Sequence, residues 1–537
     1  MNLVPDAPSD APNYWCTWSL QNYTFGQGEE TFNMAELEGA RGALHARNNI
    51  IEDLLVGENG WANSIFEDIR KDLIVMLDDG WDLPLLQIPV LKNNKNSSIR
   101  DLLDSFLNML HLKKFLSSFH LHSDRFPSAR GRSEERLKLL SENMKKLGWK
   151  GIGLWVAAQE ASNFKLSFDL RRLRYWKERV DWSVYADIRY WKIDWGMKMH
   201  IVPFRKLLTS LAKERNIFVE HAHPRSPFNN KFGSGLTSKK YVKHALRLLE
   251  FSDVYRTYDV SPQLSIPSTL DRVAKILTNS HEKGSGKQLI NCEDEVYIGA
   301  ALGCAIGIMR HPYRGLRMRN DGKELDFAMP PPRNSKYRID EVIRAIKWHR
   351  IAPPFSSSDL KTKISEEILY DEWLFKSGDF WDKGVLNKII KQGAPAIVAR
   401  GIQLPEVKTE GEKPYVISSR NPNGAVSIAM LGRITENKEY YTPRADVTLH
   451  LTMDDKVIGI FGFFNSLILQ FESSREITEI WAQDLKGDEA IDISGKVRQQ
   501  NTSIVLSGEI LEDIGLKNAS EEDISDPGLV INIKGLL

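Results

Sequence analysis

The sequence from residue 13 to about residue 316 alternates short apolar runs with longer stretches in which apolar residues recur at helical spacing. This alternation is typical of β/α units, in which helices join parallel strands. The candidate strands lie at residues 14–18, 72–76, 151–156, 190–196, 217–220, 253–256, 288–291 and 303–309. Eight such units, over roughly the length that the fold requires, predict an α/β fold of the (β/α)8 barrel type.

The remainder of the chain follows a different pattern. Three prolines at residues 330–332 interrupt the alternation, and helical spacing returns at 339–350 and 364–375. From about residue 396 short strand-like runs follow one another, separated by turn residues, which predicts an antiparallel β-sandwich. We therefore expect a barrel at 1–330, a helical connector at 331–395 and a sandwich at 396–537. The long connection at 82–133 is interpreted as a lid or rim insertion.

The composition excludes several classes of protein. Hydrophobic residues make up 42% and charged residues 27% of the 537 residues, which is typical of globular proteins. Lys+Arg 72 against Asp+Glu 71 leaves a net charge of +1, which argues against nucleic acid or a membrane as the main partner. The three cysteines form no disulfide framework and no paired C-x-x-C metal motif. The first 15 residues lack the pattern of a signal peptide and are Pro/Asp-rich, as is common after a cleavage site. The compartment is therefore expected to be periplasmic or extracellular if a leader was removed, and cytoplasmic otherwise.

Polar residues gather at the carboxyl ends of the predicted strands. They are Asp78, Asp79, Lys192, Asp194, Glu220, Arg256, Asp259 and Glu293. In a (β/α)8 barrel this rim carries the active site, because the loops there converge on one mouth. Side chains alternate along a strand, so Lys192 and Asp194 are expected to point the same way while Ile193 points into packing. A cation and a carboxylate flanked by Trp191 and Trp195 suit a sugar, which has polar groups and apolar faces.

Several of these segments resemble retaining α-galactosidases and their relatives in glycoside hydrolase families 27 and 36. The matching motifs are Trp-Cys-Thr-Trp at 15–18, Leu-Asp-Asp-Gly-Trp at 77–81, Arg-Phe-Pro at 125–127, the passage 147–155 and Tyr-Trp-Lys-Ile-Asp at 190–194. The resemblance spans most of residues 13–315 and is only architectural beyond them. It implies a (β/α)8 barrel followed by a β-sandwich, and double-displacement hydrolysis of a terminal α-galactoside or a related β-L-arabinopyranoside.

The resemblance also implies roles for individual residues. Asp194 corresponds to the nucleophile, with Lys192 beside it, and Asp259 to the acid/base, with Arg256 as a contact to the sugar. The separation of Arg256 from Asp259 is one residue shorter than in many members of the family, so Asp253 is an alternative acid/base. The remaining residues that would contact substrate are Asp78, Asp79, Glu220, Trp18, Trp81 and Trp155. No cofactor and no metal are expected, and the partner is an oligosaccharide or glycoconjugate substrate; a homo-oligomer is compatible with the sequence.

Other interpretations of the same residues stay open. Asp78-Asp79-Gly80 also fits a plain turn, the tryptophans fit a core, and Glu293 belongs to an acidic cluster that could simply start a helix. Glu220 and the pair His221-x-His223 could bind a metal ion, as in a metal-dependent amidohydrolase. A non-catalytic carbohydrate-binding protein on a glycosidase scaffold is the third hypothesis.

Overall fold

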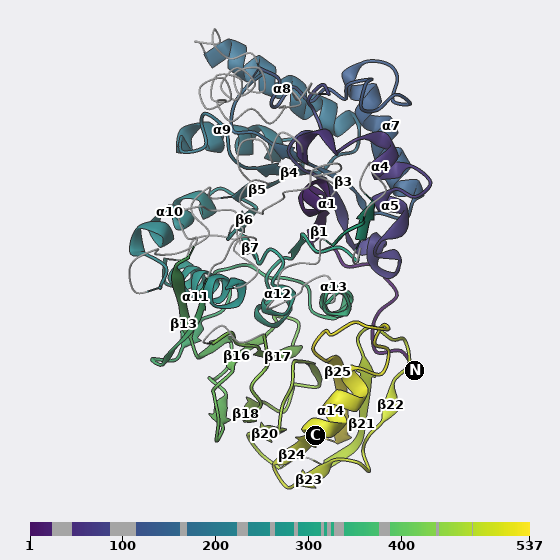
Figure 1. Ribbon diagram of the computed structural model, residues 1–537. Coiled ribbons are helices and arrows are strands. Elements are labelled where there is room, and N and C mark those ends of the chain that lie inside the picture. Colours follow the sequence, from purple (N-terminus) through teal and green to yellow (C-terminus); the bar gives the residue numbers. More distant parts are fainter. Residues whose placement is uncertain are drawn as a thin grey trace.

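The computed structural model describes residues 1–23, 46–85, 114–161, 169–222, 235–257, 264–283, 288–312, 316–318, 324–326, 338–374, 387–435, 440–474 and 476–536, and the statements below concern these residues (Figure 1). The N-terminal half forms a barrel surrounded by helices, and the C-terminal part forms two layers of β-sheet beside it (Figure 1).

The barrel sheet contains eight parallel strands. These are β1 Tyr14–Cys16, β2 Ile74–Leu77, β3 Gly151–Val156, β4 Tyr190–Ile193, β5 Phe218–Ala222, β6 Val254–Arg256, β7 Leu289–Asn291 and β8 Gly307–Ile308. They pair in sequence order and β8 pairs with β1. A single parallel bridge between Asn291 and Ala305 joins the β7 and β8 sides. The predicted (β/α)8 barrel is therefore confirmed.

Helices follow most of the strands and cover the outside of the barrel. They are α1 Trp18–Tyr23, α4 Glu52–Val56, α5 Trp61–Ser64, the 3-10 helix η1 Glu67–Asp72, α7 Ser133–Lys146, α8 Asp169–Tyr185, α9 Val202–Lys213, α10 Lys239–Leu249, α11 Ser265–Lys283 and α12 Val296–Leu302. Helix α7 buries Leu137, Leu140 and Met144, the stripe expected of an amphipathic helix on a barrel.

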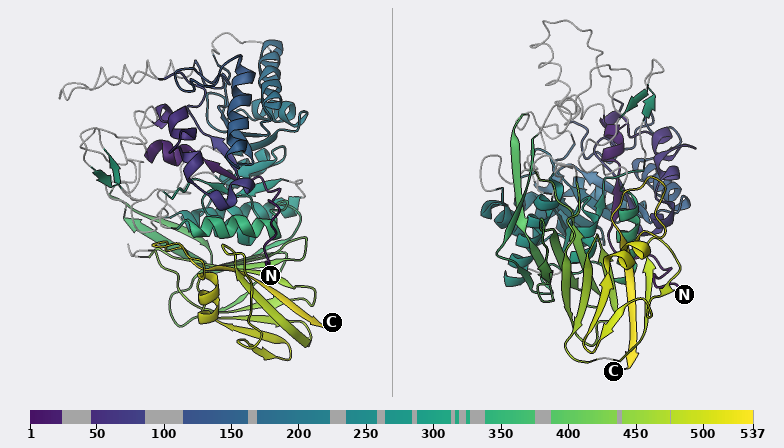
Figure 2. Two further views of the ribbon diagram at one scale, coloured as in Figure 1. Left: turned by 90° about the vertical axis from the view of Figure 1, so that its right-hand side faces the viewer. Right: turned by 60° about the horizontal axis from the view of Figure 1, so that its bottom comes forward.

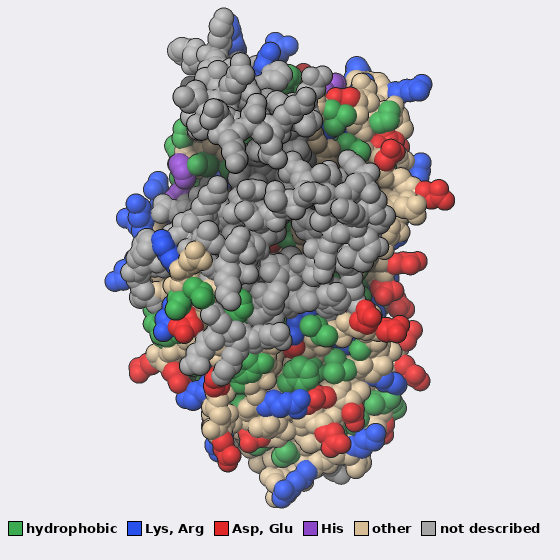
Figure 3. All heavy atoms as spheres, viewed as in Figure 1, with side chains coloured by type: hydrophobic (Ala, Val, Ile, Leu, Met, Phe, Trp, Pro, Cys, Tyr) green, Lys and Arg blue, Asp and Glu red, His purple; other side chains and the backbone are tan. Residues whose placement is uncertain are grey.

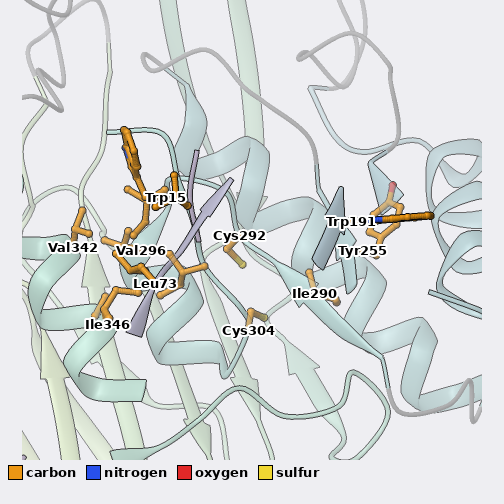
Figure 4. Close-up of a cluster of buried hydrophobic side chains, with 14 of the residues drawn as sticks. Trp15, Leu73, Trp191, Tyr255, Ile290, Cys292, Val296, Cys304, Val342 and Ile346 are labelled. Carbon is orange, nitrogen blue, oxygen red and sulfur yellow. The ribbon is translucent and has the colours of Figure 1, made fainter. Parts of the chain in front are cut away.

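Alternation along the strands separates two layers of side chains. Trp15, Trp191, Tyr255 and Ile290 belong to the large core between strands and helices, with Val296 of α12 (Figure 4). The intervening residues form a second cluster inside the barrel, made of Tyr14, Cys16, Met76, Tyr190 and Val254. Lys192 and Arg256 are two residues further along their strands than Tyr190 and Val254, so they share the inward direction. The predicted common direction of Lys192 and Asp194, opposite to Ile193, agrees with this division.

The connector departs from its prediction. Helix α13 Asp340–Ile351 matches the helix expected at 339–350, and it packs on α12 and η1. The helix expected at 364–375 is wrong, because this segment contains β12 Ile368–Leu374, paired antiparallel with β13 Ile389–Pro395. Its acidic residues favour a helix locally, but pairing with β13 and the burial of alternate residues Asp371 and Trp373 override that preference.

The sandwich consists of an eight-stranded and a five-stranded sheet. The larger sheet contains β11 Thr362–Ile364, β14 Ile397–Arg400, β16 Tyr415–Arg420, β17 Val426–Leu431, β19 Val457–Phe461, β25 Gly528–Leu536, β21 Glu476–Asp484 and β22 Ile491–Asp492. The smaller sheet contains β15 Glu406–Lys408, β18 Asp446–Leu451, β20 Ser466–Phe471, β24 Ser503–Ser507 and β23 Arg498–Gln500, and helix α14 Gly508–Gly515 follows β24. Pairing is antiparallel except at β14–β16, β17–β19 and β18–β20, so the predicted sandwich is present with mixed sheets. A short hairpin of β9 Leu316–Met318 and β10 Glu324–Asp326 lies outside both layers.

The larger sheet packs against the barrel through α12 and α13, which lie between the two parts (Figures 1 and 2). The buried pair of Arg344 and Asp484 crosses this interface at 2.9 Å. The N-terminus also contacts the sandwich, since Leu3 N donates to Gln483. On the face shown in Figure 3, acidic and basic side chains both occur over the sandwich, in keeping with the balanced charge of the chain. Within the described part of the chain, no helix is long and apolar enough to cross a membrane.

Candidate active site

Three side chains meet inside the mouth of the barrel, one from β1, one from β4 and one from the residue that follows β2. Lys192 Nζ lies 2.7 Å from Asp78 Oδ2, and the Cys16 thiol donates to the same oxygen at 3.0 Å. Burial opposes the charge on Lys192, but attraction to Asp78 and Glu293 outweighs it and raises the pKa of Lys192 above its ordinary value. Burial, followed by the negative charge of Asp78, raises the pKa of Cys16. At neutral pH Lys192 is therefore an ammonium ion and Cys16 a neutral thiol.

Asp194 lies directly after β4 and is 6% exposed. Its Oδ2 accepts from Arg256 Nη2 at 2.6 Å, whereas its Oδ1 is buried and has no hydrogen-bond partner among the residues described. Arg205 of α9 holds the backbone, donating to the carbonyl oxygens of Ile193 at 2.9 Å and Asp194 at 2.6 Å. One oxygen of the carboxylate is thus held by a guanidinium, and the other has no hydrogen-bond partner among the described residues.

Glu293 was the residue whose role the sequence left most open, and the structure brings it into the same group. Both of its oxygens lie 2.8 Å from Arg256 Nη1, and Oε1 lies 3.9 Å from Lys192 Nζ. Its side chain is 3% exposed. Its position two residues after β7 is the signal that places it among the strand-end residues in the sequence.

Asp79 is held by a residue that sequence reasoning did not find. Arg47 Nε and Nη2 donate to Asp79 Oδ2 at 2.9 and 2.6 Å, and the guanidinium lies 5.1 Å from the ring centre of Trp195. Gly80, at φ 112°, permits this contact, because a Cβ there would lie 2.7 Å from the backbone of Arg47. Burial nevertheless raises the pKa of Asp79.

Glu220 does not lie at the rim as a reader of sugar hydroxyls. It is fully buried inside the barrel, where it accepts from Tyr14 at 3.1 Å, Tyr190 at 3.0 Å and Asn291 at 2.6 Å. All three donors are inward-facing side chains of barrel strands. The Glu220 carboxylate is therefore bound by side chains of the barrel strands. Glu220 lies beside Lys192, its register partner on β4.

In the described part of the segment 220–223, Glu220 and His221 are not arranged to share a metal ion. His221 points out of the barrel, where Arg205 lies 3.0 Å from Nδ1 and Thr209 lies 2.7 Å from Nε2. Glu220 and His221 face opposite sides of β5, so they cannot bind one ion together. His223 lies outside the described residues. Within the described ranges, no group of three or more His, Cys, Asp or Glu side chains has the geometry to hold a metal ion.

The tryptophans that the sequence predicts as substrate contacts are mainly buried and packed against other side chains. Trp81 is fully buried and its Nε1 donates to the Trp155 carbonyl at 2.9 Å. Trp155 is 2% exposed and lies beside Lys192 in the β3–β4 register. Trp18 is half-buried against the inner cluster of the barrel. Trp18 packs on the inner cluster that contains Cys16, Trp155 lies beside Lys192, and Trp81 belongs to the large core.

Of the two acid/base candidates, Asp253 lies within the described residues. Asp253 precedes β6, at the amino end of the strand, where it accepts from Val219 N at 2.9 Å and pairs with Lys213 at 2.9 Å. That is the end of the barrel opposite to Asp78 and Asp194, so the alternative assignment to Asp253 is not compatible with the fold. Asp259 lies outside the described residues.

No protein-family model matches the chain, and no curated protein matches it. Among solved structures, it is similar to a family GH27 β-L-arabinopyranosidase from Geobacillus stearothermophilus, with 8% identity and a TM-score of 0.36 over 99% of this chain and 98% of that chain. It is also similar to a candidate α-galactosidase from Bacteroides fragilis, with 10% identity and a TM-score of 0.38 over 98% of this chain and 79% of that chain. At such identities and TM-scores the likeness identifies no function.

Proposed function

We propose that this protein is a retaining glycoside hydrolase that removes terminal α-galactosyl or related β-L-arabinopyranosyl units through a covalent glycosyl-Asp194. The observation that supports this proposal most strongly is the state of Asp194, which is buried, bound at Oδ2 by Arg256 and unengaged at Oδ1 among the described residues. A carboxylate held in this way can attack from a fixed direction with one oxygen.

The reaction proceeds in two displacements. In the first, Oδ1 of Asp194 bonds to the anomeric carbon while the bond to the leaving oxygen breaks, and that oxygen takes a proton from the acid/base. In the second, water attacks the same carbon, gives its proton to the acid/base and releases the carboxylate. Lys192 and Asp78 stay paired at 2.7 Å and offer a donor and an acceptor to sugar hydroxyls.

The first experiment compares hydrolysis of p-nitrophenyl α-galactoside, β-L-arabinopyranoside and α-N-acetylgalactosaminide by the wild type and Asp194→Asn. We expect turnover of one of the first two glycosides and a loss of at least about 10³-fold in kcat in the variant, because an amide cannot form the glycosyl ester. Asp253→Asn is the matched control, and its kcat should stay within a few-fold of wild type. Full activity in Asp194→Asn would refute the proposal.

The acid/base assignment has its own test, since Asp259 was assigned by resemblance. Replacing Asp259 by Ala should reduce kcat/KM for alkyl glycosides by about 10²–10⁴-fold, the usual contribution of general acid catalysis. Substrates with a dinitrophenolate leaving group need no proton and should lose far less. A uniform loss across leaving groups would contradict the assignment and reopen the search for the acid.

A further inference from the structure

We propose that Glu293 is a positioning residue, which holds Arg256 against Asp194 and offsets the positive charge around that carboxylate so that it stays reactive. The inference rests on the proposed function and extends it to a residue that the resemblance does not assign.

The contacts place one guanidinium between two carboxylates. Arg256 Nη1 lies 2.8 Å from both oxygens of Glu293, and its Nη2 lies 2.6 Å from Asp194 Oδ2. Arg256 is 1% exposed, and a cation buried to this degree requires neighbouring anions. With Glu293 in place, the direction of the Nη2–H bond toward Asp194 is fixed from the other end of the guanidinium.

The backbone around Glu293 is tied to the eighth strand, which makes it a firm anchor. Cys292 N donates to Ala305 O at 2.9 Å, and Asp294 N donates to Gly307 O at 2.7 Å. Asp294 adopts a left-handed φ of 60°, and its Oδ1 accepts from the amides of Met309 and Arg310 at 3.1 Å each. Glu293 therefore lies in a tight turn whose neighbouring residues, Cys292 and Asp294, are both hydrogen-bonded to residues 305–310.

This geometry separates Glu293 from the acid/base. Both of its oxygens accept hydrogen bonds from the same guanidinium nitrogen, so neither presents a proton to a leaving group. Its effect on the reaction has to pass through Arg256 and through the electrostatic field at Asp194.

Charge determines which half-reaction should respond. Among the described residues, the charged and titratable groups around Asp194 include Arg256 on β6, Lys192 on β4, Cys16 on β1, Asp78 and Asp79 after β2, Arg47 on Asp79, Glu220 on β5, Arg205 on α9, Tyr14, Tyr190 and Glu293 itself. In glycosylation, Asp194 loses negative charge while positive charge develops on the sugar. Removing the anion Glu293 stabilises the starting carboxylate and destabilises the developing cation, and both effects raise the barrier.

Deglycosylation should respond much less. It begins from a neutral glycosyl ester and reaches a transition state that carries both a partial cation on the sugar and a partial anion on Asp194. Removing Glu293 disfavours the first and favours the second, so the two effects largely cancel. A defect that merely disturbs the fold of the site would slow both half-reactions.

The experiment measures the two half-reactions separately in wild type, Glu293→Gln and Glu293→Asp. The kcat/KM for p-nitrophenyl glycosides reports glycosylation, and the steady-state rate after a pre-steady-state burst with dinitrophenyl glycosides reports deglycosylation. For Glu293→Gln we expect glycosylation to fall about 10- to 100-fold and deglycosylation to change less than about 3-fold. Glu293→Asp keeps the charge but is one methylene shorter, and should lie between Gln and wild type.

The matched control is Asp484→Asn, which removes the charge of an equally buried carboxylate bound to Arg344, away from the mouth. It should leave both half-reactions of the folded protein unchanged, although the loss of the anion beside the buried Arg344 lowers its stability. Equal slowing of both half-reactions in Glu293→Gln and Glu293→Asp, or no slowing, would overturn the role of Glu293. Wild-type turnover and its loss in Asp194→Asn test the proposed function separately, and an inactive wild-type protein would overturn both.

Discussion

At the scale of single residues, the thiol of Cys16 gives the site a neutral donor next to an ion pair. It is fully buried and donates to Asp78 Oδ2, the oxygen that also binds Lys192. Because burial and then Asp78 raise the pKa of Cys16, the group remains a thiol at neutral pH rather than a reactive thiolate. We expect this hydrogen bond to orient Asp78.

Two substitutions of Cys16 distinguish the effect of its hydrogen bond from the effect of its side-chain volume. Cys16→Ser keeps a donor for Asp78 and should retain kcat/KM within about 2-fold, whereas Cys16→Ala removes it and should cost about 5- to 10-fold, the size of one hydrogen bond. Steady-state kinetics on the best glycoside measures both. Equal losses in the two variants would show that the volume of Cys16 matters and its hydrogen bond does not.

The site residues that can be predicted from the sequence follow local rules, whereas those that cannot are placed by contacts between distant segments. Lys192 and Asp194 could be placed together because strand alternation is a local rule, and Asp78 because it follows a strand directly. Arg47 could not be found, because its contact with Asp79 joins segments that no local pattern relates. Glu220 was placed at the rim because a strand end is uncertain by one or two residues, and β5 continues to Ala222.

At the scale of elements, α13 carries a titratable group into the base of the barrel. His349 is 1% exposed, and Asn13 Nδ2 lies 2.8 Å from its Nδ1, which therefore accepts from the amide. Burial lowers the pKa of His349 from 6.5 to about 3. Between pH 6.5 and about 3, His349 is therefore protonated in the unfolded chain and neutral in the folded chain. The protein accordingly loses stability as the pH falls below about 6.5.

The pH dependence of unfolding tests this contribution. From neutral pH to about pH 4.5, His349 should cost the wild type about 2–3 kcal/mol, at about 1.4 kcal/mol per pH unit. His349→Gln keeps an acceptor for Asn13 and cannot be protonated, so its free energy of unfolding should fall less over this range. Denaturant titrations of both proteins at several pH values provide the measurement, and parallel curves would contradict a buried neutral imidazole.

The element that sequence reasoning assigned wrongly shows where local rules fail. Residues 364–375 contain good helix formers, yet β12 is held by antiparallel pairing with β13, including Trp373 with Ile390. The pairing partner is supplied by a segment more than a turn away in sequence, so the preference of the segment itself could not reveal it. The barrel helices were predictable because their apolar spacing is contained within each helix.

At the scale of the whole molecule, the barrel core continues into the barrel-facing side of the larger sheet, while the space between the two sheets holds a second buried cluster. The large buried cluster contains Trp15 and Ile346 of the barrel side together with Tyr415, Ala429 and Val530 of the larger sheet. Arg344 and Asp484 add an ion pair with both side chains fully buried at this interface. The two parts should therefore unfold in one transition rather than two.

Breaking the interfacial pair tests this coupling. Arg344→Met leaves Asp484 buried without its cation and should cost about 3–5 kcal/mol, with near-UV signals of the barrel and far-UV signals of both parts still changing together. Calorimetry and circular dichroism of the same sample provide the comparison. Two separate transitions in the wild type would contradict a core that continues from the barrel into the larger sheet.

The most direct test of the central claim is to trap the covalent intermediate. The wild-type protein would be incubated with an activated fluoro-glycoside of the sugar that it hydrolyses, digested and examined by mass spectrometry. We predict one added glycosyl unit on the peptide that contains Asp194, and none on Asp194→Asn. An adduct on another carboxylate, such as Glu293, or turnover with inversion at the anomeric carbon would contradict the assignment of Asp194 as the nucleophile.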